Sequence, residues 1–172
     1  MKRVSIFLGL VFVMNILTLT NITNAQNLID LANGVGSGSF ELGEFADQNY
    51  VILSKDSTVI KGWTVETESV DWVKYSYWNA ADGNYSIDLN GDFVSGCIYT
   101  TVPTVRGEKY NVSFDISGFV ADGSSTNPKS VEVWVGNIYN EIYSLSVQTV
   151  GSTKPINITW NRRSFEFIAT DS

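Results

Sequence analysis

Four aromatic residues lie close together in the chain, at Trp72, Tyr75, Tyr77 and Trp78. The faces of aromatic rings stack on the apolar C–H patches of sugars, so a solvent-facing group of this kind can bind carbohydrate. The same rings also bury large areas when they pack inside a core. All four are candidate ligand-binding residues. We expect Trp78, beside a tight turn, to be structural, and we leave Trp72 and Tyr77 evenly open between the two roles.

Polar side chains follow the aromatic group and could complete a sugar site. Asp82, Asp88 and Asn90 flank turns, and their oxygens could accept hydrogen bonds from sugar hydroxyls. The alternative, which we favour, is turn capping, in which Asp and Asn side chains bond backbone amides close to them in the chain.

The composition excludes several other kinds of chemistry. The chain has no histidine and one cysteine, Cys97. This excludes Ser-His-Asp and Cys-His catalysis, histidine-ligated zinc and an internal disulfide. Cys97 lies in an apolar alternating run and is expected to be buried. A glycosidase needs two carboxylates about 5 Å or about 6.5–9.5 Å apart across a cleft. A small sandwich without long loops has too few residues outside its strands to form such a cleft, so we expect that the protein is not an enzyme.

The N-terminus has the pattern of a secretory signal peptide. Lys2 and Arg3 precede an apolar run over residues 4–19 and small residues up to Ala25. A membrane anchor is the alternative, but the run falls short of the ~20 residues that span a bilayer. We expect cleavage after Ala25, which leaves nine basic and 18 acidic residues and a net charge of −9. That charge argues against nucleic acid and against membrane partners, and it suits a secreted or cell-surface protein.

The rest of the chain alternates in the manner of β-strands. In 110–117, the apolar residues Tyr110, Val112, Phe114 and Ile116 share one face. The other expected strands are 62–66, 70–75, 85–89, 97–102, 130–135, 143–150 and 163–169. Trp134 faces away from the three valines of its strand, and Asp115 points outward, where we expect it to be solvated.

Turn signals separate these strands, at Asp82-Gly83, Asn90-Gly91 and Asp122-Gly123. Many short strands at this spacing predict an all-β, mostly antiparallel sandwich of the jelly-roll type. We expect a flexible lead-in over residues 26–39 and one domain over 40–172. The unshielded strand near Ala169 indicates that this domain lacks its last strand.

Several segments together resemble a known family. They are GSFE at 38–41, GWTV at 62–65, VDW at 70–72, YWNAADGNYSIDLNG at 77–91 and GEKYNVSFDISG at 107–118. They resemble the bacterial choice-of-anchor C domain, which is similar to the plant cell-wall DUF642 proteins, and the resemblance runs from about residue 27 to residue 172. Both groups are galactose-binding-like sandwiches.

The resemblance implies a secreted or cell-surface, non-catalytic module that binds polysaccharide or another cell-wall glycan. It also implies that a structural calcium could be held through Glu41, with no other cofactor. The alternative is a structural or adhesive surface domain that makes protein–protein contacts. An exposed tryptophan beside an acidic group would favour sugar binding, whereas a flat Ser- and Thr-rich face, with every tryptophan buried, would favour the alternative.

Overall fold

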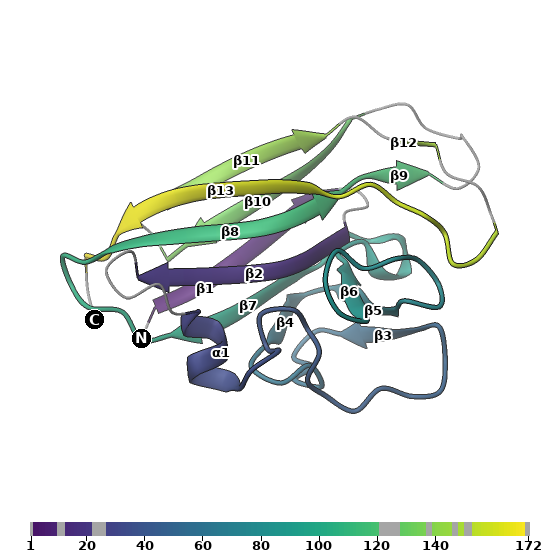
Figure 1. Ribbon diagram of the computed structural model, residues 1–172, viewed down its shortest axis with the longest axis horizontal. Helices are drawn as coiled ribbons and strands as arrows, with labels where there is room; N and C mark the ends of the chain where they lie inside the picture. Colours follow the sequence, from purple (N-terminus) through teal and green to yellow (C-terminus); the bar gives the residue numbers. More distant parts are fainter. Residues whose placement is uncertain are drawn as a thin grey trace.

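The computed structural model describes residues 2–9, 13–21, 27–120, 128–136, 139–145, 148–149 and 153–170. Two antiparallel sheets pack face to face (Figure 1). The five-stranded sheet has the order β11 (Tyr139–Leu145), β10 (Lys129–Val135), β1 (Lys2–Gly9), β7 (Cys97–Val102) and β4 (Thr64–Thr67). The six-stranded sheet has the order β13 (Asn161–Ile168), β8 (Lys109–Ser117), β2 (Val13–Asn21), β6 (Tyr85–Asp88), β5 (Ser69–Lys74) and β3 (Tyr50–Ser54). The expectation of an all-β, mostly antiparallel sandwich is confirmed.

The core between the sheets follows from alternation along the strands. On β8, Tyr110, Val112, Phe114 and Ile116 are at most 2% exposed, while the residues between them are partly exposed. The valines of β10 face them from the other sheet, and Phe165, Phe167 and Ala169 close the β13 side. Cys97 is fully buried, as expected. We call this set of buried side chains between the two sheets the inner core.

Some boundaries differ from the sequence prediction. The expected strand 143–150 is divided between β11, which begins at Tyr139, and β12 (Gln148–Thr149), which pairs in parallel with β9 (Phe119–Val120). Strand β3 and the 3₁₀ turn η1 (Gly91–Phe93) were not expected. The turn expected at Asp122-Gly123 lies outside the described residues.

The segment expected as a flexible lead-in is folded. It forms α1 (Leu28–Asn33), whose first turn is capped by Asn27 and whose Ile29 is fully buried. The carboxylate of Asp30 accepts a hydrogen bond from the Gly38 amide at 2.8 Å, which holds the following turn against the helix. The next strand begins only at Tyr50 rather than near residue 40. Local polar bonds of this kind leave no periodic trace in the sequence.

The N-terminal residues supply a central strand to each sheet. β1 lies between β10 and β7, and β2 lies between β8 and β6 (Figure 1, purple). These strands include most of the apolar run that resembles a secretory signal, whose cleavage stays a prediction. Among the described residues, no helix is both long and apolar enough to cross a bilayer.

A second, smaller hydrophobic cluster lies outside the sandwich. It contains Val73, Trp78, Ile156 and Ile158, with Tyr77 and Trp160 packed against it. Val73 follows the inward-facing Trp72 on β5, so it projects from the opposite face of the six-stranded sheet. The turn after β5 and the segment before β13 cover it there. We call this group the outer cluster.

Candidate functional site

The segment 77–79 of the sequence motif joins two distant parts of the chain. Trp78 is 4% exposed, and its indole N–H donates to the Ser86 hydroxyl at 2.7 Å. The Tyr77 carbonyl accepts from the Ile156 amide at 2.8 Å, and the Asn79 amide donates to the Ile156 carbonyl at 3.1 Å. Trp78 therefore has the structural role that we favoured for it.

Asn79 continues this connection with its side chain. Its Nδ2 donates to the Ile158 carbonyl at 3.0 Å, and its Oδ1 accepts from the Ile158 amide at 2.6 Å. Its carbonyl accepts from the indole N–H of Trp160 at 3.0 Å. The partners lie about eighty positions away in the chain, so sequence reasoning missed Asn79. Its place within the motif was the one signal that could have drawn attention to it.

Trp72 belongs to the inner core. It is fully buried, and its indole N–H donates to the Phe40 carbonyl at 3.1 Å. Its ring packs against Phe45 and Tyr85 at centroid distances of 4.8 and 5.0 Å. A ring enclosed on all sides presents no face to a ligand, so of the two roles left open for Trp72 the structure supports the core role.

At the edge where β5 ends and β3 begins, the Tyr50 and Tyr77 rings meet, and Tyr75 follows the last residue of β5. Tyr75 is 49% exposed, and Tyr50, which the sequence did not single out, is 39% exposed. Tyr77 is partly buried; its ring meets that of Tyr50 edge-to-face, with 5.5 Å between centroids. We call Tyr50, Tyr75 and Tyr77 the aromatic rim. Backbone pairing explains the contact, because Tyr50 lies opposite Val73 across the β3–β5 ladder.

Polar groups surround the rim. The ammonium group of Lys154 lies 3.4 Å from the centroid of the Tyr77 ring, a cation–π contact. The Ser76 hydroxyl donates to Oδ1 of Asn49 at 2.9 Å, and both residues are exposed. Asp82 is exposed in the turn at Asp82-Gly83, within the motif. The rim therefore combines ring faces with a cation, an amide and a hydroxyl.

The side chain of Glu41 holds the turn at Asp82-Gly83 through hydrogen bonds to the residues that follow it. Its Oε1 accepts from the backbone amides of Asn84 and Tyr85 at 2.8 and 2.9 Å, and its Oε2 accepts from Nδ2 of Asn84 at 3.2 Å. Gly83 has a φ of 64°, and a Cβ there would lie 2.4 Å from Oε1 of Glu41. Both oxygens of the expected calcium ligand thus accept protein N–H groups. The described residues contain no group of three or more His, Cys, Asp or Glu suited to holding a metal ion.

Asp88 and Asn90 lie at the other end of β6. In the register of β5 with β6, Tyr85 is opposite Lys74 near the rim, whereas Asp88 is opposite Asp71, three residues and about 10 Å along the strand. Oδ1 of Asp88 accepts from the Asn90 amide at 3.0 Å, which is the turn-capping role. The structure does not bring Asp88 and Asn90 together with the aromatic candidates.

Asp71 and Asp88, which lie opposite each other on β5 and β6, both have raised pKa values. Burial, the largest cause, and the neighbouring Asp71 raise the pKa of Asp88, the Asn90 amide and Lys129 lower it, and the resulting pKa is about 7. Burial and then Asp92 raise the pKa of Asp71 to about 6. Oδ1 of Asp71 is buried without a hydrogen-bond partner. At neutral pH this pair therefore holds a proton for part of the time.

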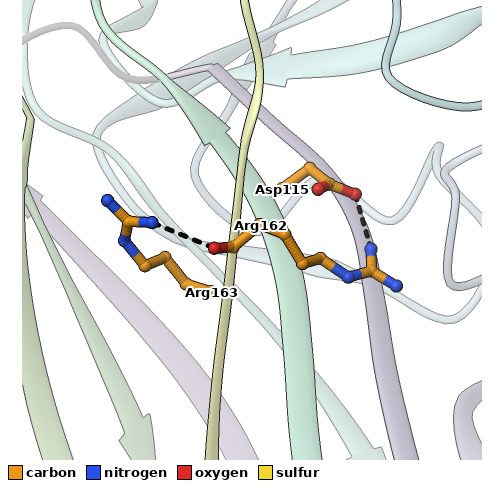
Figure 2. A network of polar contacts seen from close by, with 3 residues as sticks. All are labelled: Asp115, Arg162 and Arg163. Carbon is orange, nitrogen blue, oxygen red and sulfur yellow. Dashed lines mark hydrogen bonds and ion pairs between the residues drawn. The ribbon is translucent and has the colours of Figure 1, made fainter.

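Asp115, expected to be merely solvated, forms an ion pair. The strand register places it opposite Arg162 on β13, and the two side chains meet at 2.5 Å (Figure 2). Nη1 of Arg163 donates to the Arg162 carbonyl at 3.0 Å (Figure 2). These residues lie on the β8–β13 side of the sheet, away from the aromatic rim at its β3 edge.

The architecture defines an all-β sandwich whose motif segments are tied to one another by hydrogen bonds. The chain belongs to the family described as "Protein of unknown function (DUF642)", which matches residues 33–172. This confirms the resemblance to the DUF642 proteins. The chain is also 42% identical over 90 residues to halomucin of Haloquadratum walsbyi, a match that covers 50% of this chain and 1% of halomucin. No solved structure matches it.

Proposed function

We propose that this chain is a secreted or cell-surface, non-catalytic module that binds a polysaccharide, with the aromatic rim as its platform. The observation that carries the proposal is the contact of the Tyr50 and Tyr77 rings at the β3 edge of the six-stranded sheet, with the exposed Tyr75 two residues before Tyr77 in the chain. Tyrosine rings offer an apolar face for a sugar and a hydroxyl that reaches water. The choice-of-anchor C and galactose-binding-like resemblance supports the same ligand class.

The polar neighbours suit the hydroxyl-rich edge of a sugar. Lys154 and Asn49 supply N–H donors, and Ser76 supplies an oxygen acceptor beside the rim. Because the rings lie on an exposed edge, a polymer can run across them without its chain ends being enclosed. We therefore expect recognition of internal segments of a glycan chain rather than of free monosaccharides.

The test is retention of the full chain on insoluble cellulose, pectin, xylan and chitin, repeated with Tyr75→Ala. We expect retention on at least one polymer and its loss in the variant, with unchanged far-ultraviolet circular dichroism. Ile168→Ala is the matched control, because Ile168 is an exposed apolar residue (57%) on β13, at the opposite edge of the same sheet. Retention that survives Tyr75→Ala, Tyr50→Ala and Tyr77→Ala would remove the rim as the platform.

One observation favours the second candidate, a structural or adhesive surface domain. None of the five tryptophans is exposed: Trp63, Trp72 and Trp78 are buried, and Trp134 and Trp160 are partly buried. Tyrosines alone would carry the sugar contacts. A folded chain that is retained on none of the four polymers, and that self-associates in sedimentation velocity, would support the second candidate.

Calcium binding through Glu41 belongs to the same proposal and has its own test. A cation that binds only the folded state raises the melting temperature. Because both Glu41 oxygens accept N–H groups in this chain, we expect added calcium to leave its melting temperature unchanged and to raise that of a longer form that carries the last strand. An unchanged melting temperature in the longer form would remove the metal from the proposal.

A further inference from the structure

A lysine lies on the aromatic rim with its charge uncompensated by the protein. The ammonium group of Lys154 is 3.4 Å from the centroid of the Tyr77 ring, and Lys154 is exposed. Within the part of the chain that the structure describes, this ammonium group forms no ion pair with a carboxylate. At the opposite edge of the same sheet, by contrast, Arg162 is neutralised by Asp115. The charge of Lys154 is therefore available to a ligand.

The backbone keeps Lys154 beside the rim. Ile156, two residues further along the chain, is buried in the outer cluster. Its amide donates to the Tyr77 carbonyl at 2.8 Å, and it forms a parallel bridge with Trp78. A lysine this close to a fixed residue has a short tether. Its position over the Tyr77 ring therefore follows from the packing of the outer cluster and not only from a free choice of rotamer.

The ammonium group covers a face of the Tyr77 ring. The same ring meets the rings of Tyr50 and Trp78 edge-to-face, with 5.5 and 5.3 Å between centroids. Because Lys154 is exposed, a ligand that approaches the covered face meets the ammonium group before the ring. A neutral sugar would have to displace this group and lose the cation–π contact. An anionic group can pair with it instead, which leaves the sugar ring free to contact the neighbouring tyrosines.

A second donor borders the same two rings. The Ser76 hydroxyl donates to Oδ1 of Asn49 at 2.9 Å, which leaves Nδ2 of Asn49 as a donor. Asn49 precedes Tyr50 in the chain and Ser76 precedes Tyr77, so this hydrogen bond joins the same two segments as the contact between the rings. One charged and one neutral N–H donor therefore accompany the ring pair, a combination that suits an anion.

We propose that the aromatic rim binds an anionic polysaccharide, whose sugars carry carboxylate or sulfate groups, and that Lys154 is the residue that determines this preference. The inference rests on the proposed function, because it names the ligand class of the same platform. The net charge of −7 does not prevent such binding. At about 0.15 M salt the screening length is about 8 Å, so distant carboxylates are largely screened, whereas an ammonium group in direct contact with the ligand is not.

The test compares polymers that share a backbone and differ in charge. Polygalacturonate and its fully methyl-esterified form are one pair, and dextran sulfate and dextran are the other, which separates carboxylate from sulfate as the preferred group. Binding of the full chain is measured by affinity gel electrophoresis. We expect Kd to be lower by about fivefold for a charged polymer than for its neutral counterpart, the upper end for an exposed ion pair. The difference should shrink as salt is raised.

Three variants assign the preference to one side chain. Lys154→Gln should abolish it with unchanged circular dichroism, and Lys154→Arg should retain it. Lys55→Gln is the matched control, because it removes the same charge from an exposed lysine just after β3, about 15 Å along that strand from Tyr50.

The outcomes separate this inference from the proposed function. Equal binding to charged and neutral polymers, or a preference that persists in Lys154→Gln, overturns the inference and leaves the rim as a platform for neutral glycans. A folded chain that is retarded by no polymer, charged or neutral, overturns the proposed function and this inference together.

Discussion

The inner core and the outer cluster lie on opposite faces of the same strands but are held by different forces. The inner core is a continuous apolar layer, in which alternate residues of both sheets are removed from water. The outer cluster has four buried residues, and it is joined by side-chain-to-backbone hydrogen bonds between the motif and the segment before β13. Burial of apolar area is cumulative and non-directional, whereas the outer cluster depends on a few placed polar atoms.

This difference bears on the function of the motif. The segment YWNAADGNYS resembles a binding loop in its aromatic and acidic residues. In the structure, Trp78 and Asn79 fix the loop, Glu41 fixes its turn, and the neighbouring tyrosines remain at the surface. The motif therefore positions the aromatic rim, and most of its members are not themselves available to a ligand.

The largest expected effect comes from breaking the inner core with Trp72→Ala. The change leaves a cavity among Phe45 and Tyr85 and deprives the Phe40 carbonyl of its donor. We expect the free energy of unfolding to fall by about 3–5 kcal/mol in urea denaturation. Tyr75→Ala, three residues away but at the surface, should change it by less than about 0.5 kcal/mol. Equal effects from the two variants would contradict the distinction between core and rim.

Substitution of Asp88 measures how much a charged carboxylate on β6 destabilises the fold. Its folded pKa of about 7 lies above the ordinary value of 3.8, so the folded state binds more protons between these values. Stability should therefore fall as pH rises from 4 to 7 and stay low above 7. Asp88→Asn, which keeps an oxygen for the Asn90 amide, should be more stable than the unaltered chain at pH 8, by about 2–4 kcal/mol.

The measurement for Asp88 is urea denaturation at intervals from pH 4 to pH 8. Asp71, Asp92 and Lys129 remain in the variant, so a weaker dependence from Asp71 should persist between pH 4 and 6. The control is Asp56→Asn, an exposed carboxylate at a φ of 68° that asparagine also tolerates. A pH profile that Asp88→Asn leaves unchanged would assign the dependence to other groups.

Asn79→Ala should loosen the outer cluster and leave the inner core intact. It removes both side-chain hydrogen bonds to Ile158 and leaves that residue's amide and carbonyl without these partners. We expect a loss of about 2 kcal/mol and much faster hydrogen exchange at the Ile158 amide. Exchange in β8 should change little. Asn49→Ala, at an exposed asparagine, is the control. Comparable exchange at the Ile158 amide in both variants would show that the Asn79 side chain does not hold the segment before β13.

The smallest effect is expected at the surface pair of Asp115 and Arg162. Arg162→Ala should cost about 0.2–1 kcal/mol, because exposed ion pairs gain little over their hydration. A double-mutant cycle with Asp115→Asn isolates the pair, and the coupling energy should shrink in high salt. A coupling energy larger than the loss of unfolding free energy in Trp72→Ala would reverse the order of effects expected here.

The strands that could be predicted from the sequence are those that alternate. β7, β8, β10 and β13 were expected within a few residues of their bounds, because a period of two places every second side chain on the core face. β3 was missed although it buries Leu53, since it is an edge strand with exposed residues at Tyr50 and Ile52. Because Asn, Gly and Ser dominate the lead-in, the sequence predicts a flexible segment, yet those residues provide the caps and turns that hold it.

The candidate site was only partly predictable, because alternation along a strand does not show which distant segments meet. Tyr75 and Tyr77 were identified from their type and spacing, whereas Tyr50 and Lys154 come from distant segments that pairing and packing bring beside them. Asp88 and Asn90 are near the tyrosines in sequence but lie at the far end of a strand.

By itself, the sequence determined the class of fold, the burial of Cys97, the family and the exclusion of histidine chemistry, because these depend on composition and on local periodicity. Only the tertiary structure decided which aromatic rings reach solvent, that Asn79 and Glu41 fix the motif, and that the N-terminal residues complete both sheets. Those features depend on which backbone groups find partners across long stretches of chain, and no local pattern of side chains encodes them.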